Sequence, residues 1–103
     1  MLGGVIVDFE APLWEWDARR GDTWIFVSLP EDASEEIREL SAPTRRGFGS
    51  LRVRASIGGT TWRTSIFPGS GGPYVLPVKR AVRTAERLDA GDVAAVSLEL
   101  LDL

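Results

Sequence analysis

Basic side chains gather in the middle of this 103-residue sequence, at a spacing that suits the binding of an anion. Arg52 and Arg54 occupy alternate positions of one predicted strand, and Arg63 and Ser65 occupy alternate positions of the next. The Gly-Gly pair at 58–59 predicts a two-residue turn, which sets Arg54 opposite Arg63 and Arg52 opposite Ser65. Because directly opposed like charges destabilise a hairpin, a negative group must lie beside them. Two sources remain open, namely carboxylates of the first or last strand and a bound anion.

More positive charge follows in a helix predicted over residues 78–87. Lys79, Arg83 and Arg87 are four residues apart, which puts them on one side of this helix, and Arg80 lies beside them. The first turn of a helix is a favourable place for an anion. The alternative is that Arg83 and Arg87 only complement the dipole at the C-terminal end of the helix while Lys79 is solvated.

These residues define the candidate site of a binding module. Ser65, and Tyr74 ahead of the helix, would bring hydroxyl groups close to the start of the helix. We therefore predict a noncatalytic module that binds an anionic small molecule or a protein partner. The candidate ligand-binding residues are Arg52, Arg54, Arg63, Ser65, Tyr74, Lys79 and Arg83.

Two missing residue types restrict catalysis. The sequence has no His and no Cys, which excludes Ser-His-Asp and Cys-His nucleophile systems, disulfides and the commonest zinc, copper and iron ligands. An enzyme would have to use Lys79 as a base to Ser65, or a carboxylate pair such as Asp89 and Asp92. Asp92 follows Gly91, however, and is explained more simply as a turn residue. We expect no catalytic residue, no metal and no cofactor.

The net charge of −3 conceals a segregation of charge along the chain. Residues 1–42 carry three basic and ten acidic residues, residues 43–87 carry nine and one, and residues 88–103 carry none and four. A basic middle is typical of a nucleic-acid or anion surface, but acidic strands beside it would neutralise it. The acidic total also argues against a duplex-sized footprint. We expect no nucleic-acid binding.

One pattern occurs twice and predicts the architecture. In each copy an apolar strand runs into Leu-Pro, and a helix, a glycine and another strand follow. Proline fits the first turn of a helix because its missing N–H has no partner there. The repeat predicts two half-barrels related by a pseudo-twofold axis. The first copy comprises strand 23–29, helix 32–41, Gly47 and strand 51–57, and the second comprises strand 74–77, helix 78–87, Gly91 and strand 93–100.

Two further strands, over 4–16 and 60–67, complete a mainly β fold, and residues 17–22 and 42–47 are predicted loops. We predict one closed barrel of interleaved strands, with the two helices capping opposite openings. Trp14 and Trp16 fall on the polar face of the first strand, where they either pack at the barrel rim or serve a partner interface. The inward stripes of the helices are predicted as Ala33, Ile37 and Leu40, and as Val78, Val82 and Ala85.

The length suits a single domain over residues 1–103. The sequence has no apolar run of about 18 residues, so we expect no membrane span. Its first ten residues lack a basic region ahead of a long apolar core, so we expect no signal peptide and a cytoplasmic protein. We expect a monomer or a weak homodimer.

The motifs resemble a known family. The resemblance is carried by the stretch from Trp24 to Pro30, the hairpin from Gly58 to Pro68, and the stretch from Tyr74 to Lys79 with Arg83 and Gly91-Asp92. These look like the DUF1905 family, small bacterial domains of unknown function. The resemblance implies a double-split β-barrel, as in the AbrB-like transcription factors, which have a similar strand-Pro-Lys-helix-Arg-Gly-Asp-strand unit. It implies no activity, and those regulators make nucleic-acid binding the alternative function.

Overall fold

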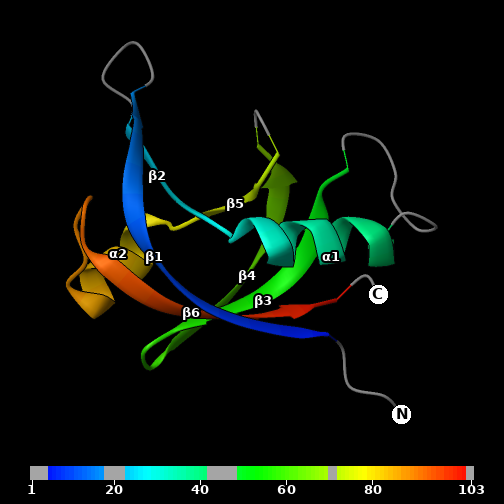
Figure 1. Ribbon diagram of the computed structural model, residues 1–103. Coiled ribbons are helices and arrows are strands. Elements are labelled where there is room, and N and C mark those ends of the chain that lie inside the picture. Colours follow the sequence, from blue (N-terminus) through cyan, green and yellow to red (C-terminus); the bar gives the residue numbers. More distant parts are fainter. Residues whose placement is uncertain (1–4, 18–22, 42–48, 70–71, 102–103) are drawn as a thin grey trace.

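The computed structural model describes residues 5–17, 23–41, 49–69 and 72–101 (Figure 1). The predicted loop over 42–47, with Gly47, and most of the loop over 17–22 lie outside the described residues. The described chain forms β1 (Ile6–Asp17), β2 (Thr23–Ser28), α1 (Glu31–Ser41), β3 (Leu51–Ile57), β4 (Thr60–Pro68), β5 (Tyr74–Pro77), α2 (Arg80–Glu86) and β6 (Val93–Leu100).

The six strands close into one antiparallel barrel in the order β1-β2-β5-β4-β3-β6. The predicted interleaving is confirmed, because β5 pairs with β2 and β3 pairs with β6. In Figure 1 the helices α1 and α2 lie at opposite ends of the barrel, as the sequence predicts. The mainly β character of the fold is therefore confirmed.

The β3-β4 hairpin has the predicted register. Arg54 pairs with Arg63 and Arg52 pairs with Ser65 across the turn, in which Gly58 has a φ of 59°. On its other side β3 pairs with β6, which sets Glu99 against Arg54. The two side chains form an ion pair. The negative group beside Arg54 thus comes from the last strand, whereas Arg63 has no ion pair with a carboxylate of the described residues.

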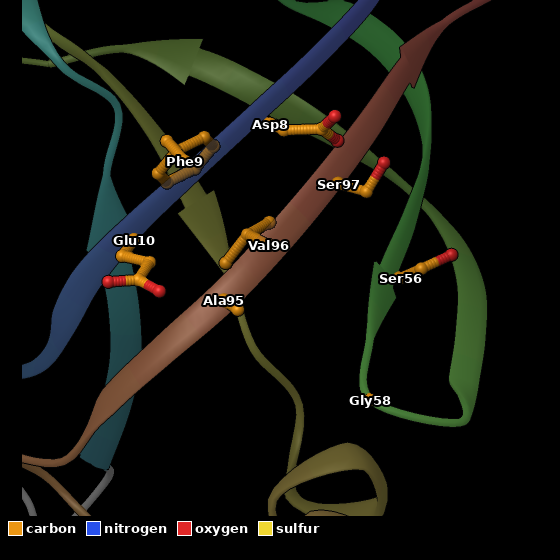
Figure 2. A pocket seen from close by; sticks show the side chains of 8 residues that line it. All are labelled: Asp8, Phe9, Glu10, Ser56, Gly58, Ala95, Val96 and Ser97. Atoms are coloured by element: carbon orange, nitrogen blue, oxygen red, sulfur yellow. The ribbon is translucent and has the colours of Figure 1, made fainter.

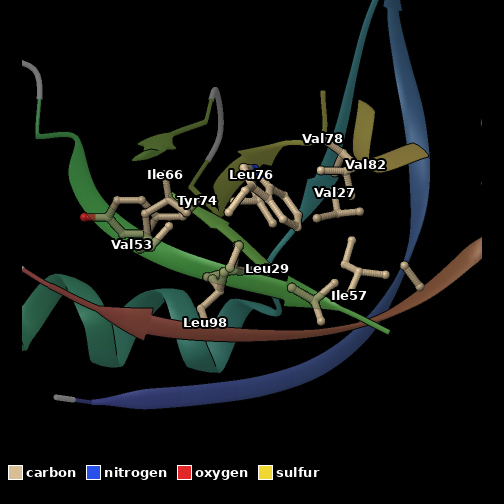
Figure 3. Close-up of a cluster of buried hydrophobic side chains, with 14 of the residues drawn as sticks. Val27, Leu29, Val53, Ile57, Ile66, Tyr74, Leu76, Val78, Val82 and Leu98 are labelled. Atoms are coloured by element: carbon tan, nitrogen blue, oxygen red, sulfur yellow. The ribbon is translucent and has the colours of Figure 1, made fainter. Parts of the chain in front are cut away.

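The interior of the barrel is filled by alternate side chains of all six strands (Figure 3). In β3 the buried set is Leu51, Val53, Ala55 and Ile57, while Arg52 between them is exposed. This alternation is what turns the basic residues of β3 and β4 outward, because successive side chains of a strand point to opposite faces.

Helix α1 faces the barrel with a different stripe from the predicted one. Ile37 is 1% exposed as expected, but Leu40 is 46% exposed, and the other buried residues are Ser34 and Ser41. The cause is a hydrogen bond in which the backbone N–H of Tyr74 donates to Ser34 Oγ (3.0 Å). This bond rotates Ser34 inward and Leu40 outward, so the prediction of an apolar stripe through Leu40 was wrong.

Helix α2 begins later than the predicted residue 78. The backbone N–H of Val78 donates to the carbonyl of Ile25 (2.9 Å), which prolongs the strand ladder, and Lys79 is extended with φ −69° and ψ 161°. Val78 and Val82 are buried as predicted, but Ala85 is exposed. The helix is therefore a seven-residue segment whose buried residue is Val82, and Val78 is buried just ahead of it.

Candidate functional site

A hollow of about 340 Å³ opens where β5 ends and α2 begins. Its wall includes four basic residues and the exposed Trp24, together with residues of β2, β4 and β5 such as the buried Trp62. We call the four basic residues of this wall, Arg63, Lys79, Arg80 and Arg83, the basic pocket. No acidic residue belongs to the described wall.

The short length of β5 creates this hollow. Strand β5 has four residues, whereas its neighbours β2 and β4 have six and nine. Its last residue, Pro77, pairs with Phe26. If the register of β5 continued by two residues, Lys79 would lie between Trp24 of β2 and Arg63 of β4. The chain instead turns into α2, and the gap left between β2 and β4 is the hollow.

The charge of the basic pocket is not compensated within the described chain. Arg63, Lys79 and Arg80 form no ion pair with any carboxylate of the described residues. Arg83 is fixed in place, because its Nε donates to the carbonyl of Val78 (3.1 Å). A second hollow of about 340 Å³ shares Arg80 and Arg83 and adds Arg87. Three basic residues therefore line this second hollow, together with the carboxylate of Asp89.

The structure brings together three of the seven predicted site residues, Arg63, Lys79 and Arg83. Sequence reasoning missed Trp24 and Trp62, and it placed Arg80 beside the site but not in it. Only the strand order brings Trp24 of β2 and Trp62 of β4 to this pocket, because β5 lies between these two strands. No local sequence pattern predicts that β2 and β4 lie on either side of β5.

The other four predicted residues lie elsewhere. Arg52 and Ser65 face each other across β3 and β4, outside the wall of the hollow, and Arg54 pairs with Glu99. Tyr74 is 0% exposed within the core, with Arg38 over its ring at 5.6 Å from the centroid. Its hydroxyl has no hydrogen-bond partner among the described residues. These four side chains contribute nothing to the basic pocket.

The catalytic alternatives gain no geometry from the fold. Ser65 does not line the hollow that Lys79 lines, and no hydrogen bond joins them within the described chain. Asp92 Oδ2 accepts the backbone N–H of Asp89 (2.8 Å), and the backbone N–H of Asp92 donates to the carbonyl of Asp89 (3.0 Å). This supports the interpretation of Asp92 as a turn residue. The described residues contain no cluster of three or more metal-ligating side chains.

A larger hollow, of about 510 Å³, lies over β1, β6 and the β3-β4 turn (Figure 2). Asp8, Ser97 and Ser56 occupy one row across three strands, and Glu10 lies further along β1. Ser56 shares a hydrogen bond with Thr61 of β4 (2.9 Å). The described wall of this larger hollow contains carboxylates and no basic residue, so the hollow does not suit an anion.

Aromatic rings form a row on the outside of the β1-β2 hairpin. Trp24 and Phe26 stack with centroids 6.2 Å apart, and Phe26 lies 5.1 Å from Trp14. Trp14 is held by a hydrogen bond from its indole N–H to Ser28 Oγ (2.9 Å). Trp16 pairs with Trp24 in the strand register. Trp24 thus belongs both to this row and to the wall of the basic pocket.

Fold and site together define a class of protein: a small closed antiparallel barrel with two helices and a cationic pocket where its shortest strand ends. The chain belongs to the family described as Domain of unknown function (DUF1905), whose family model matches residues 9–98. The resemblance noted from the motifs is therefore confirmed. A comparison with curated proteins found no match. Neither α1 nor α2, the two helices of the described chain, has the length and apolar character needed to cross a membrane.

Proposed function

We propose that this protein is a noncatalytic module that binds an anionic small molecule in the basic pocket. The observation that carries the proposal is four basic side chains in one wall that contains no described acidic residue. Like charges gathered without counter-charges repel one another, and a bound anion relieves that repulsion. Arginine side chains also offer planar donor pairs that match phosphate and carboxylate groups.

An anion in the basic pocket should stabilise the folded protein. A ligand that binds only the folded state adds about 2.7 kcal/mol when its concentration is 100 times its dissociation constant. For wild type we expect a rise in melting temperature that grows with phosphate, nucleotide or small carboxylate concentration. An Arg63→Gln variant should lose this response and should be as stable as wild type, or more stable, without ligand.

A thermal-shift screen at constant ionic strength measures both effects. Arg52→Gln is the matched control, because Arg52 lies on the same hairpin outside the hollow and its loss should leave the response intact. If Arg63→Gln destabilises the free protein and no anion stabilises wild type, Arg63 has a structural role and the pocket proposal is wrong.

Nucleic-acid binding is the alternative that the resemblance to AbrB-like regulators raises. The acidic residues of α1 and the net charge of −3 disfavour a long phosphate backbone. We expect no binding of duplex DNA at physiological salt tighter than the nonspecific range of about 1–100 µM. A titration of labelled random-sequence and genomic duplexes tests this. Tighter, salt-sensitive binding that disappears in Arg83→Ala would establish the regulator-like function instead.

A protein partner at the aromatic row is the second candidate. Exposed aromatic groups are typical of interfaces, and Trp14, Trp16 and Trp24 are exposed together on one hairpin. We propose that the partner is a second copy of this chain, so that the monomer associates weakly into a homodimer. Sedimentation equilibrium should show self-association that Trp16→Ser weakens. If wild type and Trp16→Ser associate equally, this surface is not the dimer interface.

We also propose that the barrel is a double-split barrel made of two related units, β1-β2-α1-β3 and β4-β5-α2-β6. The circular strand order supports this, because exchanging β1 with β4, β2 with β5 and β3 with β6 returns the same order. Each unit also has Leu-Pro ahead of its helix, directly after β2 in the first unit and at the end of β5 in the second. A pseudo-twofold axis would then relate the ends that carry α1 and α2, although only α2 is basic.

A further inference from the structure

We propose that the anion is a nucleoside phosphate, whose phosphate is held by the basic pocket and whose base stacks on Trp24. This inference rests on the proposed anion-binding function and names the class of ligand. The same chemistry is offered by a free nucleotide and by one unit of a single strand, so the experiment below separates these sources.

Trp24 stands at the same level of the barrel as the charges. It lies on β2 across from the register position that Lys79 would fill, with Arg63 on the far side of the gap. All three side chains belong to the wall of one hollow. A ligand that contacts the basic pocket therefore has the indole of Trp24 within the same hollow.

The Trp24 indole is both available and supported. Its side chain is 53% exposed, so a large apolar surface faces solvent beside four cations. Its ring stacks on Phe26 at an interplanar angle of 13°, and Phe26 contacts Trp14 in turn. A ring held by its neighbour loses little freedom when a base stacks on it, and every base has a flat face to offer.

A simple inorganic anion would leave the apolar part of this site without a ligand contact. Phosphate needs only the cations, whereas the wall also contains Trp24, which is 53% exposed, and the half-buried Pro77. The volume of about 340 Å³ lies within the range of small-molecule sites, about 300–1,000 Å³. An aromatic group joined to a phosphate matches both the apolar and the cationic parts of the wall.

The experiment compares three probes by isothermal titration calorimetry at constant ionic strength: inorganic phosphate, ribose 5-phosphate and adenosine 5′-monophosphate. The nucleotide should bind about 5- to 150-fold more tightly than ribose 5-phosphate, which is the effect of stacking one base on an aromatic ring. Equal binding of all three probes would overturn the inference while leaving the proposed anion site intact. Binding of none would overturn the proposed function itself.

Two matched variants locate the base. Trp24→Leu should bind the nucleotide and ribose 5-phosphate equally, while keeping its affinity for ribose 5-phosphate. Phe67→Leu is the control, because Phe67 is an aromatic residue of β4 that is 42% exposed but does not line the hollow. It should keep the preference for the nucleotide. If Trp24→Leu keeps that preference as well, the base does not stack on Trp24 and the inference is wrong.

A five-nucleotide oligoadenylate distinguishes the two sources. If further bases follow the row from Trp24 through Phe26 to Trp14, the oligonucleotide binds more tightly than the mononucleotide and Trp14→Leu removes the gain. That result supports the inference with a single strand as the source. If the oligonucleotide binds no more tightly while the nucleotide is still preferred over ribose 5-phosphate, the inference is supported with a free nucleotide as the source.

Discussion

Arg80→Glu should lower the affinity for phosphate or a nucleotide by at least about 100-fold. A hydrogen bond to a charged group contributes about 1.5–3 kcal/mol, and the new carboxylate would also lie beside Arg63, Lys79 and Arg83. The fold should tolerate the change, because Arg80 is exposed and is the first residue of α2, where a negative side chain suits the helix dipole. Calorimetric titration with phosphate measures the loss.

Two further variants make this test specific. Arg80→Gln removes the charge without reversing it and should lose less affinity than Arg80→Glu. Arg52→Glu introduces the same change of charge on β3, outside the hollow, and should bind nearly as wild type does. If Arg80→Glu and Arg52→Glu lose affinity equally, only the total charge matters and the basic pocket is not the site.

Leu76→Ala should lower the free energy of unfolding by about 2–5 kcal/mol, the range for removing a buried leucine side chain. Leu76 lies on β5, is 0% exposed, and is surrounded by the core side chains in Figure 3. Urea denaturation followed by circular dichroism measures the change.

Leu40→Ala is the matched control for this prediction. The sequence puts Leu40 on the inward stripe of α1, but the structure has it 46% exposed. An exposed substitution changes stability by less than about 0.5 kcal/mol, and alanine is the better helix former. A loss comparable to that of Leu76→Ala would mean that Leu40 is buried in solution and that α1 is rotated.

The strands and the register of the β3-β4 hairpin could be predicted because the relevant information is local. Alternation in β3 identifies the buried face, and the Gly-Gly turn fixes the pairing of Arg54 with Arg63. The sequence leaves the partner of Arg54 open between two sources, because which strand lies on the other side of β3 depends on closure of the whole barrel. That strand is β6, and Glu99 is the partner.

The helix stripes show where local patterns are insufficient. The apolar pattern of α1 predicts Leu40 inward, but a hydrogen bond from a strand 40 residues away brings Ser34 inward instead. The basic pocket is a similar case. Lys79 and Arg83 could be found from helical spacing, whereas Trp24 joins them only because β5 ends two residues too early to cover the gap.

That early end also has a mechanical consequence for the barrel. β5 is joined to β4 through two residue pairs and to β2 through three, whereas β1 is joined to β6, and β3 to β4, through seven. β5 is thus the most weakly paired strand of the barrel, and local opening of the barrel should begin along β5. A ligand that contacts β2, β4 and α2 at once would join the two strands on either side of β5 and oppose this opening. Ligand binding should therefore slow amide exchange along β5, including at Tyr74 and Val75, which do not line the hollow.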